Sequence, residues 1–357
     1  MQIDLANSLR ELSEVYDETS NNSFVSLYIN KNVYPAALSH RMQVCHNALS
    51  GDERKNYDAT MDEIKDALKK VVWDHIAVFA SKKHNFLKYV VLPLDVENSL
   101  VVDSSPYIRP LARIHDEWES FTLILLSSDF AKIYSVALGR VTQEKKLSID
   151  LMNKHKKGGF SQARFQRLRK GAIHAFFTDV LEALQKHADN EIILAGPGQA
   201  KNQFFDMLPK HLKDSVVEVV DIDARDETQL LKRSIDLMKE KEHFESSNAV
   251  KHLKEEIVTD GLAVYGVDET LAAVRNGQVE LLIIEKDFRA SGWICEQCQI
   301  VRVGRAKVCS NCGGSVSEVD VLEEILEFAE RTDAKVEFTG DPEIADLGHV
   351  GGILRYK

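Results

Sequence analysis

Two C-x-x-C pairs near the C-terminal end constrain the fold of this chain more than any other feature of its sequence. Cys295 and Cys298 form the first pair, Cys309 and Cys312 form the second, and ten residues separate the two pairs. Each pair can form a tight turn that presents two thiolates, and two such turns complete a tetrahedral zinc site. Because four thiolates leave no coordination position open, the spacing predicts a structural zinc ion rather than a catalytic one.

Four free thiols, a redox pair and an iron–sulfur cluster are the alternatives to zinc. The fifth cysteine, Cys45, stands alone in a helical pattern and is expected to be a small buried hydrophobe. Cysteines that bind a metal ion instead of forming disulfides are typical of a reducing compartment. Since no run reaches eighteen apolar residues and the first residues do not have a signal-peptide layout, we expect a cytoplasmic protein.

Strand-like and helix-like segments alternate along the 357 residues, which predicts an α/β fold with helices packed on sheets. Apolar runs predict strands at residues 24–29, 75–80, 86–94, 121–126, 131–138, 191–195, 216–220, 279–285 and 335–338. Helical spacing predicts helices at residues 5–15, 36–49, 57–72, 161–186, 227–241, 267–276 and 321–331. We divide the chain into domains at residues 1–116, 117–245 and 246–357, with the cysteine insert at about residues 290–318.

Residues 154–170, KHKKGGFSQARFQRLRK, carry seven lysines and arginines and no acid, although the whole chain has a formal charge of −11. Gly158 and Gly159 lie among these cations. Two adjacent glycines give the backbone freedom to approach a partner closely, so the stretch predicts a loop that contacts an anion. Because the chain as a whole repels polyanions, contact with RNA is expected at such a local patch.

These stretches together resemble the archaeal and eukaryotic class-one peptide chain release factors and their relatives, which include Pelota and the Vms-type ribosome rescue factors. The loop at residues 154–169 is similar to that family's K-H-x-x-G-G-Q-S-x-x-R-F-x-R-L-R element. Residues 265–271 (YGVDETL), 279–284 (VELLII) and 351–356 (GGILRY) are similar to its C-terminal domain. Archaeal members also carry a zinc-binding insert where the four cysteines lie.

The resemblance implies three α/β domains, of which the middle one is ribonuclease-H/ribosomal-S11-like and the last is L7Ae-like with the zinc insert. It also implies a factor that enters the ribosomal A site and reaches the peptidyl transferase centre and peptidyl-tRNA. A translational GTPase that docks on the C-terminal domain is the further partner that the resemblance implies.

Two motifs that read stop codons in the family are altered here. The N-I-K-S motif falls on residues 47–50 (NALS), where Leu49 replaces the lysine. The Y-x-C-x-x-x-F motif falls on residues 107–113, where Arg109 and Arg113 replace the cysteine and the phenylalanine. Loss of the lysine ammonium removes a cation that would face the codon, so stop-codon reading is not expected.

Phe160 replaces the glutamine that follows the two glycines in the family, and Gln162 lies two residues later. The resemblance makes Gly158, Gly159, Phe160 and Gln162 the group that would assist attack of water on the peptidyl-tRNA ester. The Phe160 amide or the Gln162 side chain could stabilise the oxyanion. The alternative is that hydrolysis is lost and the Phe160 ring stacks on a base or fills a groove.

Six residues around the glycines are expected to neutralise RNA phosphates: Lys154, His155, Lys156, Lys157, Arg164 and Arg167. Their alternative is a solvated start of a helix. Phe165 and Leu168, three residues apart on that helix, are expected in the core. The preferred function is codon-independent ribosome rescue by hydrolysis of peptidyl-tRNA, and stop-codon-dependent termination is a second candidate. A non-hydrolytic ribosome-binding factor and a tRNA-directed nuclease are two further candidate functions.

Overall fold

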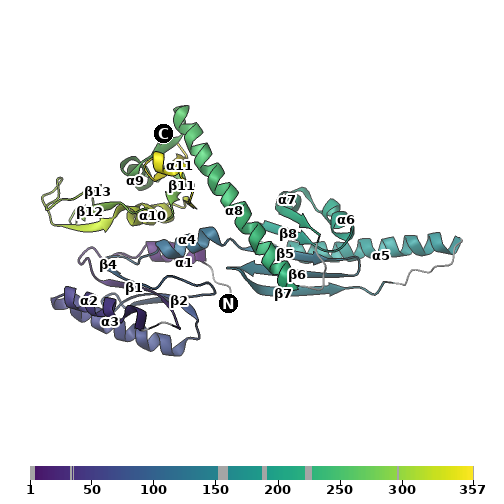
Figure 1. The fold of residues 1–357 in the computed structure, drawn as a ribbon, viewed down its shortest axis with the longest axis horizontal. Coiled ribbons are helices and arrows are strands. Elements are labelled where there is room, and N and C mark those ends of the chain that lie inside the picture. Colours follow the sequence, from purple (N-terminus) through teal and green to yellow (C-terminus); the bar gives the residue numbers. More distant parts are fainter. Residues whose placement is uncertain are drawn as a thin grey trace. The chain divides into compact units, whose positions relative to one another are not determined.

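The computed structural model describes residues 5–32, 34, 36–151, 160–186, 191–221, 227–295 and 297–356. It has a mixed α/β fold with four sheets, which confirms the fold class predicted from the alternating pattern (Figure 1). The chain divides into two compact units, one made of Met1–Glu117 and Lys241–Lys357, the other of Trp118–Glu240. Among the described helices, none combines the length and the apolar character that a membrane crossing needs.

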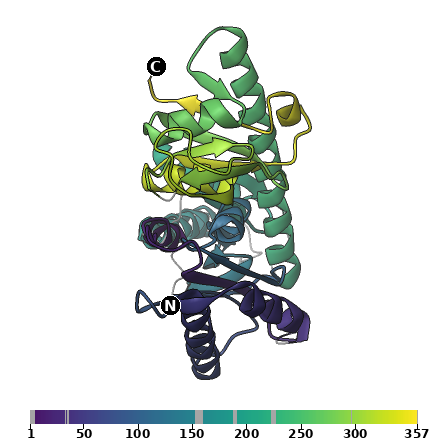
Figure 2. The ribbon, with the colours of Figure 1, turned by 90° about the vertical axis from the view of Figure 1, so that its left-hand side faces the viewer.

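The N-terminal lobe of the first unit, residues 5–117, is an antiparallel sheet covered by helices. Its elements are α1 (Leu5–Ser13), β1 (Phe24–Asn30), η1 (Ala36–Leu38), α2 (Ser39–Ala48), α3 (Gly51–Lys70), β2 (His75–Ser81), β3 (Phe86–Leu92), β4 (Ser99–Asp103) and α4 (Arg109–Glu117). The strand order is β3-β2-β1-β4, so β1 is central, and its first six residues are all buried. Tyr57, Met61 and Ile64 recur at helical spacing along α3 and join the core of this lobe. Figure 2 shows the ribbon of this lobe in purple and blue.

The C-terminal lobe of the first unit, residues 241–356, holds two further sheets. Its elements after the long helix α8 (Glu227–Val258) are β10 (Ala263–Tyr265), α9 (Val267–Arg275), β11 (Val279–Glu285), β12 (Ser291–Cys295), β13 (Val301–Val303), β14 (Val316–Asp320), α10 (Val321–Arg331), β15 (Lys335–Thr339), α11 (Glu343–Asp346) and β16 (Val350–Leu354). The larger sheet has the order β10-β16-β11-β15, with β11 and β15 parallel. The smaller sheet, β13-β12-β14, is antiparallel.

The two lobes of the first unit pack directly on each other, with α1 against α10 and α4 against β15. Buried polar groups form much of this contact. The Ser105 hydroxyl donates to the Glu327 carboxyl at 2.5 Å, and the Phe338 amide donates to Asp116 at 2.8 Å. Because these groups are removed from water, each hydrogen bond is needed to offset the loss of hydration.

The second unit is a five-stranded mixed sheet in the order β7-β6-β5-β8-β9. Its elements before α8 are β5 (Phe121–Leu126), β6 (Phe130–Ala137), β7 (Arg140–Ser148), α5 (Phe160–Gln185), β8 (Glu191–Ala195), α6 (Ala200–Met207), α7 (Lys210–Asp214) and β9 (Val216–Val220). All six residues of β5 are buried. Successive residues of this strand face opposite sides of the sheet. Ile124 belongs to a hydrophobic core that includes residues of α5, and Leu125 belongs to a second core that includes residues of α8.

Several elements differ from the sequence-based expectation, and strand β7 and helix α8 are two of them. Strand β7 lies where no strand is predicted, because its RVTQEKKLS sequence has no apolar alternation and eight of its nine residues are exposed. The helix predicted at residues 227–241 continues as α8 to Val258, across the domain boundary predicted near Glu245. The helix expected at the start of the last domain is thus continuous with the one before it, and Ser246 and Val250 of this segment are buried.

Candidate functional site

The four cysteines lie in two turns that share one backbone geometry. In the first turn the Gln299 amide donates to the Cys295 carbonyl at 3.0 Å, and in the second the Gly313 amide donates to the Cys309 carbonyl at 3.0 Å. The residue after each pair has a left-handed backbone, with φ of 55° at Gln299 and 76° at Gly313. Glycine adopts this conformation without strain, whereas glutamine adopts it at a cost of about 1 kcal/mol.

The four sulfur atoms are gathered at the spacing of a tetrathiolate metal site. The Sγ atoms of Cys295 and Cys312 lie 3.4 Å apart, those of Cys298 and Cys309 lie 3.6 Å apart, and all four lie within 4.8 Å of one another. A zinc–sulfur bond of about 2.3 Å implies sulfur pairs about 3.8 Å apart in a tetrahedron. The donor set therefore fits zinc, and it leaves no position for a substrate.

Hydrogen-bond donors lower the pKa of two of the four cysteines, Cys298 and Cys309, whereas the pKa of Cys312 is raised. The Cys298 amide donates to Cys295 Sγ at 3.4 Å, and the Asn311 amide donates to Cys309 Sγ at 3.3 Å. The Asn311 side chain also donates to Cys298 Sγ, and this hydrogen bond is the main cause that lowers the pKa of Cys298 to about 6. Thiolates, unlike thiols, bind a metal ion directly.

Little apolar material supports the small sheet around the cysteines. Trp293, Cys295 and Cys309 form its core, with exposed fractions of 5%, 0% and 3%. On this face the cluster is too small to hold the strands by itself, whereas the other face packs on α10, with Ile294 and Val301 only 4% and 1% exposed. The cysteine cluster therefore lies where a metal cross-link would contribute most to the stability of β13-β12-β14.

The basic loop of the second unit is only partly described. Lys154, His155, Lys156, Lys157, Gly158 and Gly159 lie outside the described residues, as do the side chains of Phe160 and Gln162. Phe160 is the first residue of α5, so the two glycines immediately precede a helix of 26 residues.

The N-terminal half of α5 extends beyond the sheet, as Figure 1 shows. Arg164 and Arg167 are exposed, and their spacing of three places them on one stripe of the helix. Phe165 and Leu168 are 37% and 53% exposed, so their predicted burial in the core is wrong. Among the side chains of α5 that the structure describes, from Arg164 onward, Phe176 is the first that is fully buried, because only that part of the helix lies on the sheet.

The residues at the codon-motif positions are buried or tied to the C-terminal lobe. Leu49 follows α2 and is 6% exposed in the core of the N-terminal lobe. Arg109 on α4 has a side chain only 8% exposed, and it donates to the Phe288 carbonyl at 2.5 Å. Arg113, one turn later, pairs with Glu117 at 2.9 Å and with Asp287 at 3.2 Å.

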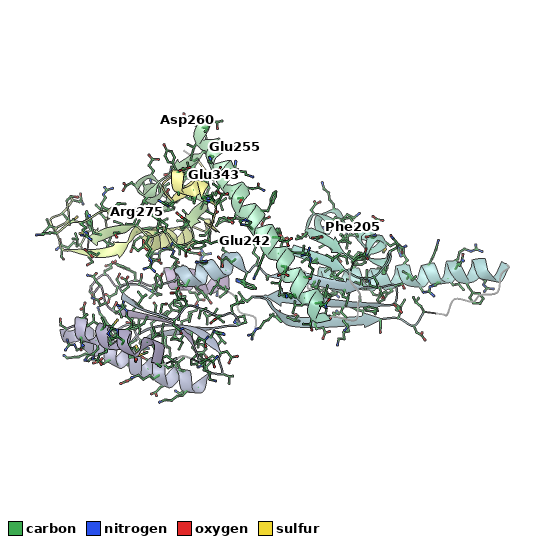
Figure 3. The ribbon with its side chains drawn as sticks, in the orientation of Figure 1. Phe205, Glu242, Glu255, Asp260, Arg275 and Glu343 are labelled. Atoms are coloured by element: carbon green, nitrogen blue, oxygen red, sulfur yellow. The ribbon has the colours of Figure 1, made fainter. Side chains whose placement is uncertain are left out.

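A carboxylate cluster in the first unit has no counterpart in the sequence motifs. Asp116 on α4, Glu242 on α8 and Glu337 on β15 bring oxygen atoms within 4.8 Å of one another (Figure 3 labels Glu242). Burial, followed by the charge of Glu337, raises the pKa of Asp116 to about 8. Lys286 lies 3.7 Å from Glu242 and partly offsets the negative charge. The three acids are far apart along the chain, so no spacing in the sequence indicates the cluster.

Comparison with known proteins gives two family matches that together span the second unit and the C-terminal lobe. Residues 120–241 match the family described as eRF1 domain 2, and residues 243–357 match eRF1 domain 3.

Two curated relatives carry the name peptide chain release factor subunit 1. The relative from Archaeoglobus fulgidus is 30% identical over 71% of this chain and 70% of its own length. The relative from Methanopyrus kandleri is 35% identical over 55% of this chain, and the match spans about half of that relative, 51%. Among solved structures, an archaeal translation termination factor, aRF1, is 20% identical with a TM-score of 0.27, covering 99% of this chain and 97% of that chain.

Proposed function

This chain belongs to the eRF1 family of peptide chain release factors, and we propose that it acts at the ribosomal peptidyl transferase centre, where it promotes hydrolysis of peptidyl-tRNA during codon-independent ribosome rescue. It is a translation factor of the release-factor type. The whole chain's activity, its ribosomal substrate and its partners are part of the proposal.

The observation that carries the proposal is the exposed, acid-free first half of α5. No aspartate or glutamate occurs between Asp150 and Asp179, while Arg164 and Arg167 face solvent. A helix that extends beyond its sheet can enter a narrow RNA-lined channel without bringing the acidic body of the chain close to the RNA. Lys154, His155, Lys156 and Lys157 add further cationic side chains immediately before the helix in the sequence.

In this role the loop contributes position and hydrogen-bond donors rather than a general base. Gly158 and Gly159 let the backbone approach the ester closely, and the Phe160 amide or the Gln162 side chain donates to the developing oxyanion. Holding water and ester together while excluding bulk solvent supplies the remaining rate enhancement, to which the ribosome contributes.

Codon-independent rescue is favoured over termination because of the residues at the codon-motif positions. Leu49 is enclosed in the core of its lobe, and Arg109 is engaged with the C-terminal lobe. Neither side chain has the exposure that contact with a codon requires.

A peptide-release assay on three substrates tests the proposal. The purified protein is incubated with peptidyl-tRNA on ribosomes with an empty A site, on ribosomes programmed with a stop codon, and on isolated large subunits. We expect release without a stop codon. Release that requires the stop codon would instead support termination.

Replacing Gly159 with tryptophan is expected to lower the release rate at least a hundredfold, because a bulky side chain prevents close approach of the backbone to the ester. The matched control is Gly340→Ala in the C-terminal lobe, where open space surrounds the added methyl group. Equal release by Gly159→Trp and the wild type would contradict the placement of the reacting loop.

The principal alternative is a non-hydrolytic factor that occupies the A site, and Phe160 in place of glutamine is the observation that favours it. Tight ribosome binding without release on any substrate supports that function. A nuclease would cleave tRNA and leave the peptide ester intact. A nuclease also needs carboxylates that can hold a metal ion. Among the described residues, the carboxylate cluster of Asp116, Glu242 and Glu337 belongs to the first unit and not to the unit that carries the loop, so it does not support this alternative.

The proposal also includes the finer assignments that follow from family membership. They are a structural zinc ion on Cys295, Cys298, Cys309 and Cys312, a translational GTPase docked on the C-terminal domain, and a cytoplasmic location. The three-domain division, with a ribonuclease-H/ribosomal-S11-like middle domain and an L7Ae-like last domain, is proposed on the same ground.

A further inference from the structure

A second acid-free stretch lies in the cysteine-bearing sheet of the C-terminal lobe. Between Glu296 and Glu318 the sequence contains three cations and no aspartate or glutamate. The cations Arg302, Arg305 and Lys307 lie in a short segment, residues 302–308, which we name the basic turn. Apart from the half-buried Ala306, every residue of the basic turn is exposed, although the whole chain carries a charge of −11.

The three cations have no carboxylate partner among the described residues. Within the part of the chain that the structure describes, no aspartate or glutamate oxygen lies within 4.0 Å of Arg302, Arg305 or Lys307. The lysines of α3 differ in this respect, since Lys65 and Lys69 each pair with an aspartate at 2.9 Å. Unpaired cations that are close together along the chain are available to an external anion.

The basic turn is held in place at both ends. At its start Arg302 and Val303 pair with β12, and the Gly304 amide donates to the Ser291 carbonyl at 3.0 Å. At its end it runs into Cys309 of the cysteine cluster. A turn fixed in this way loses little conformational entropy when it binds a ligand.

Neighbouring side chains extend the surface. Arg275, labelled in Figure 3, is exposed at the end of α9 and donates to the Gln299 carbonyl of the first cysteine turn at 3.4 Å. Val303 and Val308 are 41% and 61% exposed on the basic turn itself. Cations interleaved with small apolar side chains can neutralise phosphates while covering the sugar surface between them.

We propose that the basic turn is a second RNA-contacting surface, in which Arg302, Arg305 and Lys307 bind the phosphate backbone of ribosomal RNA without reading its sequence. The inference rests on the proposed function, because a factor on the ribosome meets ribosomal RNA as its nearest polyanion. The turn lies in the first unit, so it is separate from the loop that precedes α5.

Binding of the full chain to protein-free ribosomal RNA, measured by fluorescence anisotropy over a series of salt concentrations, tests the inference. The test variant carries Arg302→Gln, Arg305→Gln and Lys307→Gln. The control variant carries Lys31→Gln, Lys251→Gln and Lys335→Gln, which removes the same charge from exposed sites elsewhere in the first unit. We expect the test variant to reduce the slope of log K against log salt by about two to three and the control to leave it unchanged.

If the slope of log K against log salt is the same for the test variant and the wild type, the inference is overturned. If the test variant loses its metal ion, the three cations also offset the negative charge of the cysteine thiolates. The single substitution Lys307→Gln then decides, with an expected slope change of about one for RNA contact and none for charge balance. Peptide release by the wild-type protein is measured in parallel. If release fails while the test variant still changes the salt slope, the hydrolytic function is contradicted and the RNA-contacting surface is not.

Discussion

Arg109 connects the two lobes of the first unit through a nearly buried guanidinium group. It donates to the Phe288 carbonyl at 2.5 Å and lies 3.4 Å from the Asp320 carboxylate and 3.6 Å from that of Glu323. A buried charge that loses its partners costs several kcal/mol, and so do carboxylates that lose their cation. The side chain therefore contributes to the contact between the lobes.

Arg109→Ala is expected to lower the free energy of unfolding of the first unit by about 3–5 kcal/mol, because it removes a nearly buried cation together with its hydrogen bond to Phe288 and its ion pair with the partly buried Asp320. Urea denaturation followed by tryptophan fluorescence measures the change. Arg113→Ala is the matched control one helical turn away, where the side chain is 38% exposed. An exposed pair contributes about 0.2–1 kcal/mol, so similar losses for the two variants would contradict a special role for Arg109.

At the residue scale the sequence predicts sites whose ligands are close together along the chain. The four cysteines carry their geometry in two short spacings, and the structure gathers them. The contact of Arg109 with Phe288 and the cluster of Asp116, Glu242 and Glu337 depend on pairing between distant segments, which no local spacing encodes. The burial predicted for Phe165 and Leu168 is wrong because helical spacing predicts which residues share a face of a helix but not which part of the helix packs on the sheet.

Gly171 lies in the exposed part of α5, and nothing lies within 4 Å of a Cβ added there. Gly171→Ala is expected to raise the stability of the second unit by about 1 kcal/mol, because glycine is the weaker helix former. Thermal unfolding followed by circular dichroism at 222 nm measures the effect.

The matched contrast is Gly196→Ala at the end of β8. There the added carbon would lie 1.9 Å from the Leu126 carbonyl oxygen, and φ is 151°. This variant is expected to be destabilised. A loss of stability in Gly171→Ala would contradict the assignment of Gly171 as an exposed helical position with open space around it.

Metal removal is expected to unfold the small sheet β13-β12-β14 without unfolding the second unit. Trp293 is 5% exposed beside the cysteines, so its fluorescence should shift to the red when a chelator removes the ion. Metal analysis should find about one zinc ion per chain. An unchanged emission spectrum in a chain shown to be free of metal would contradict the stabilising role.

At the element scale the strongly patterned segments are predictable from the sequence and the weakly patterned ones are not. Strand β5 is a continuous apolar run because both faces of its sheet are covered. Strand β7 is held by backbone hydrogen bonds to β6, and its side chains leave no periodic signal. The full length of α8 is not predicted because residues 241–248 are mostly charged or polar, which favours a domain boundary at that point.

The contact between the two lobes of the first unit contains several carboxyl groups with raised pKa values. Burial is the main cause that raises the pKa of Asp116 and of Glu323 to about 8, and that of Glu324 to about 7. A carboxyl group with a folded pKa above its unfolded value binds more protons in the folded state. Its contribution to stability is therefore present at low pH and is lost as the pH rises toward the folded pKa.

We expect the urea midpoint of the first unit to fall as the pH rises from about 5 to about 8, and to change little above that range. Glu323→Gln should flatten the dependence, because the amide cannot ionise. Glu318→Gln, at an exposed site on β14, is the matched control and should leave it unchanged. A midpoint that rises over this interval would contradict the assignment of raised pKa values.

At the scale of the whole molecule, the alternating pattern predicts an α/β chain but not which segments pack together. The sequence divides into consecutive stretches, whereas the first unit is built from the two ends of the chain, Met1–Glu117 and Lys241–Lys357. Besides the contact of α1 with α10, the pairing includes polar contacts such as that of Arg109 with Asp320. Hydrophobic periodicity carries no information about such charges.

The pairing of the two ends fixes an order of events while the protein itself is being made. Arg109 leaves the ribosome long before Phe288, its acceptor, has been synthesised, and the intervening second unit is completed first. At a synthesis rate of about 5–20 residues per second, the N-terminal lobe waits roughly 10–40 s with its polar contact face uncovered. Pulse-labelled chains stopped before residue 241 are therefore expected to have a folded second unit and an N-terminal lobe without its partner lobe.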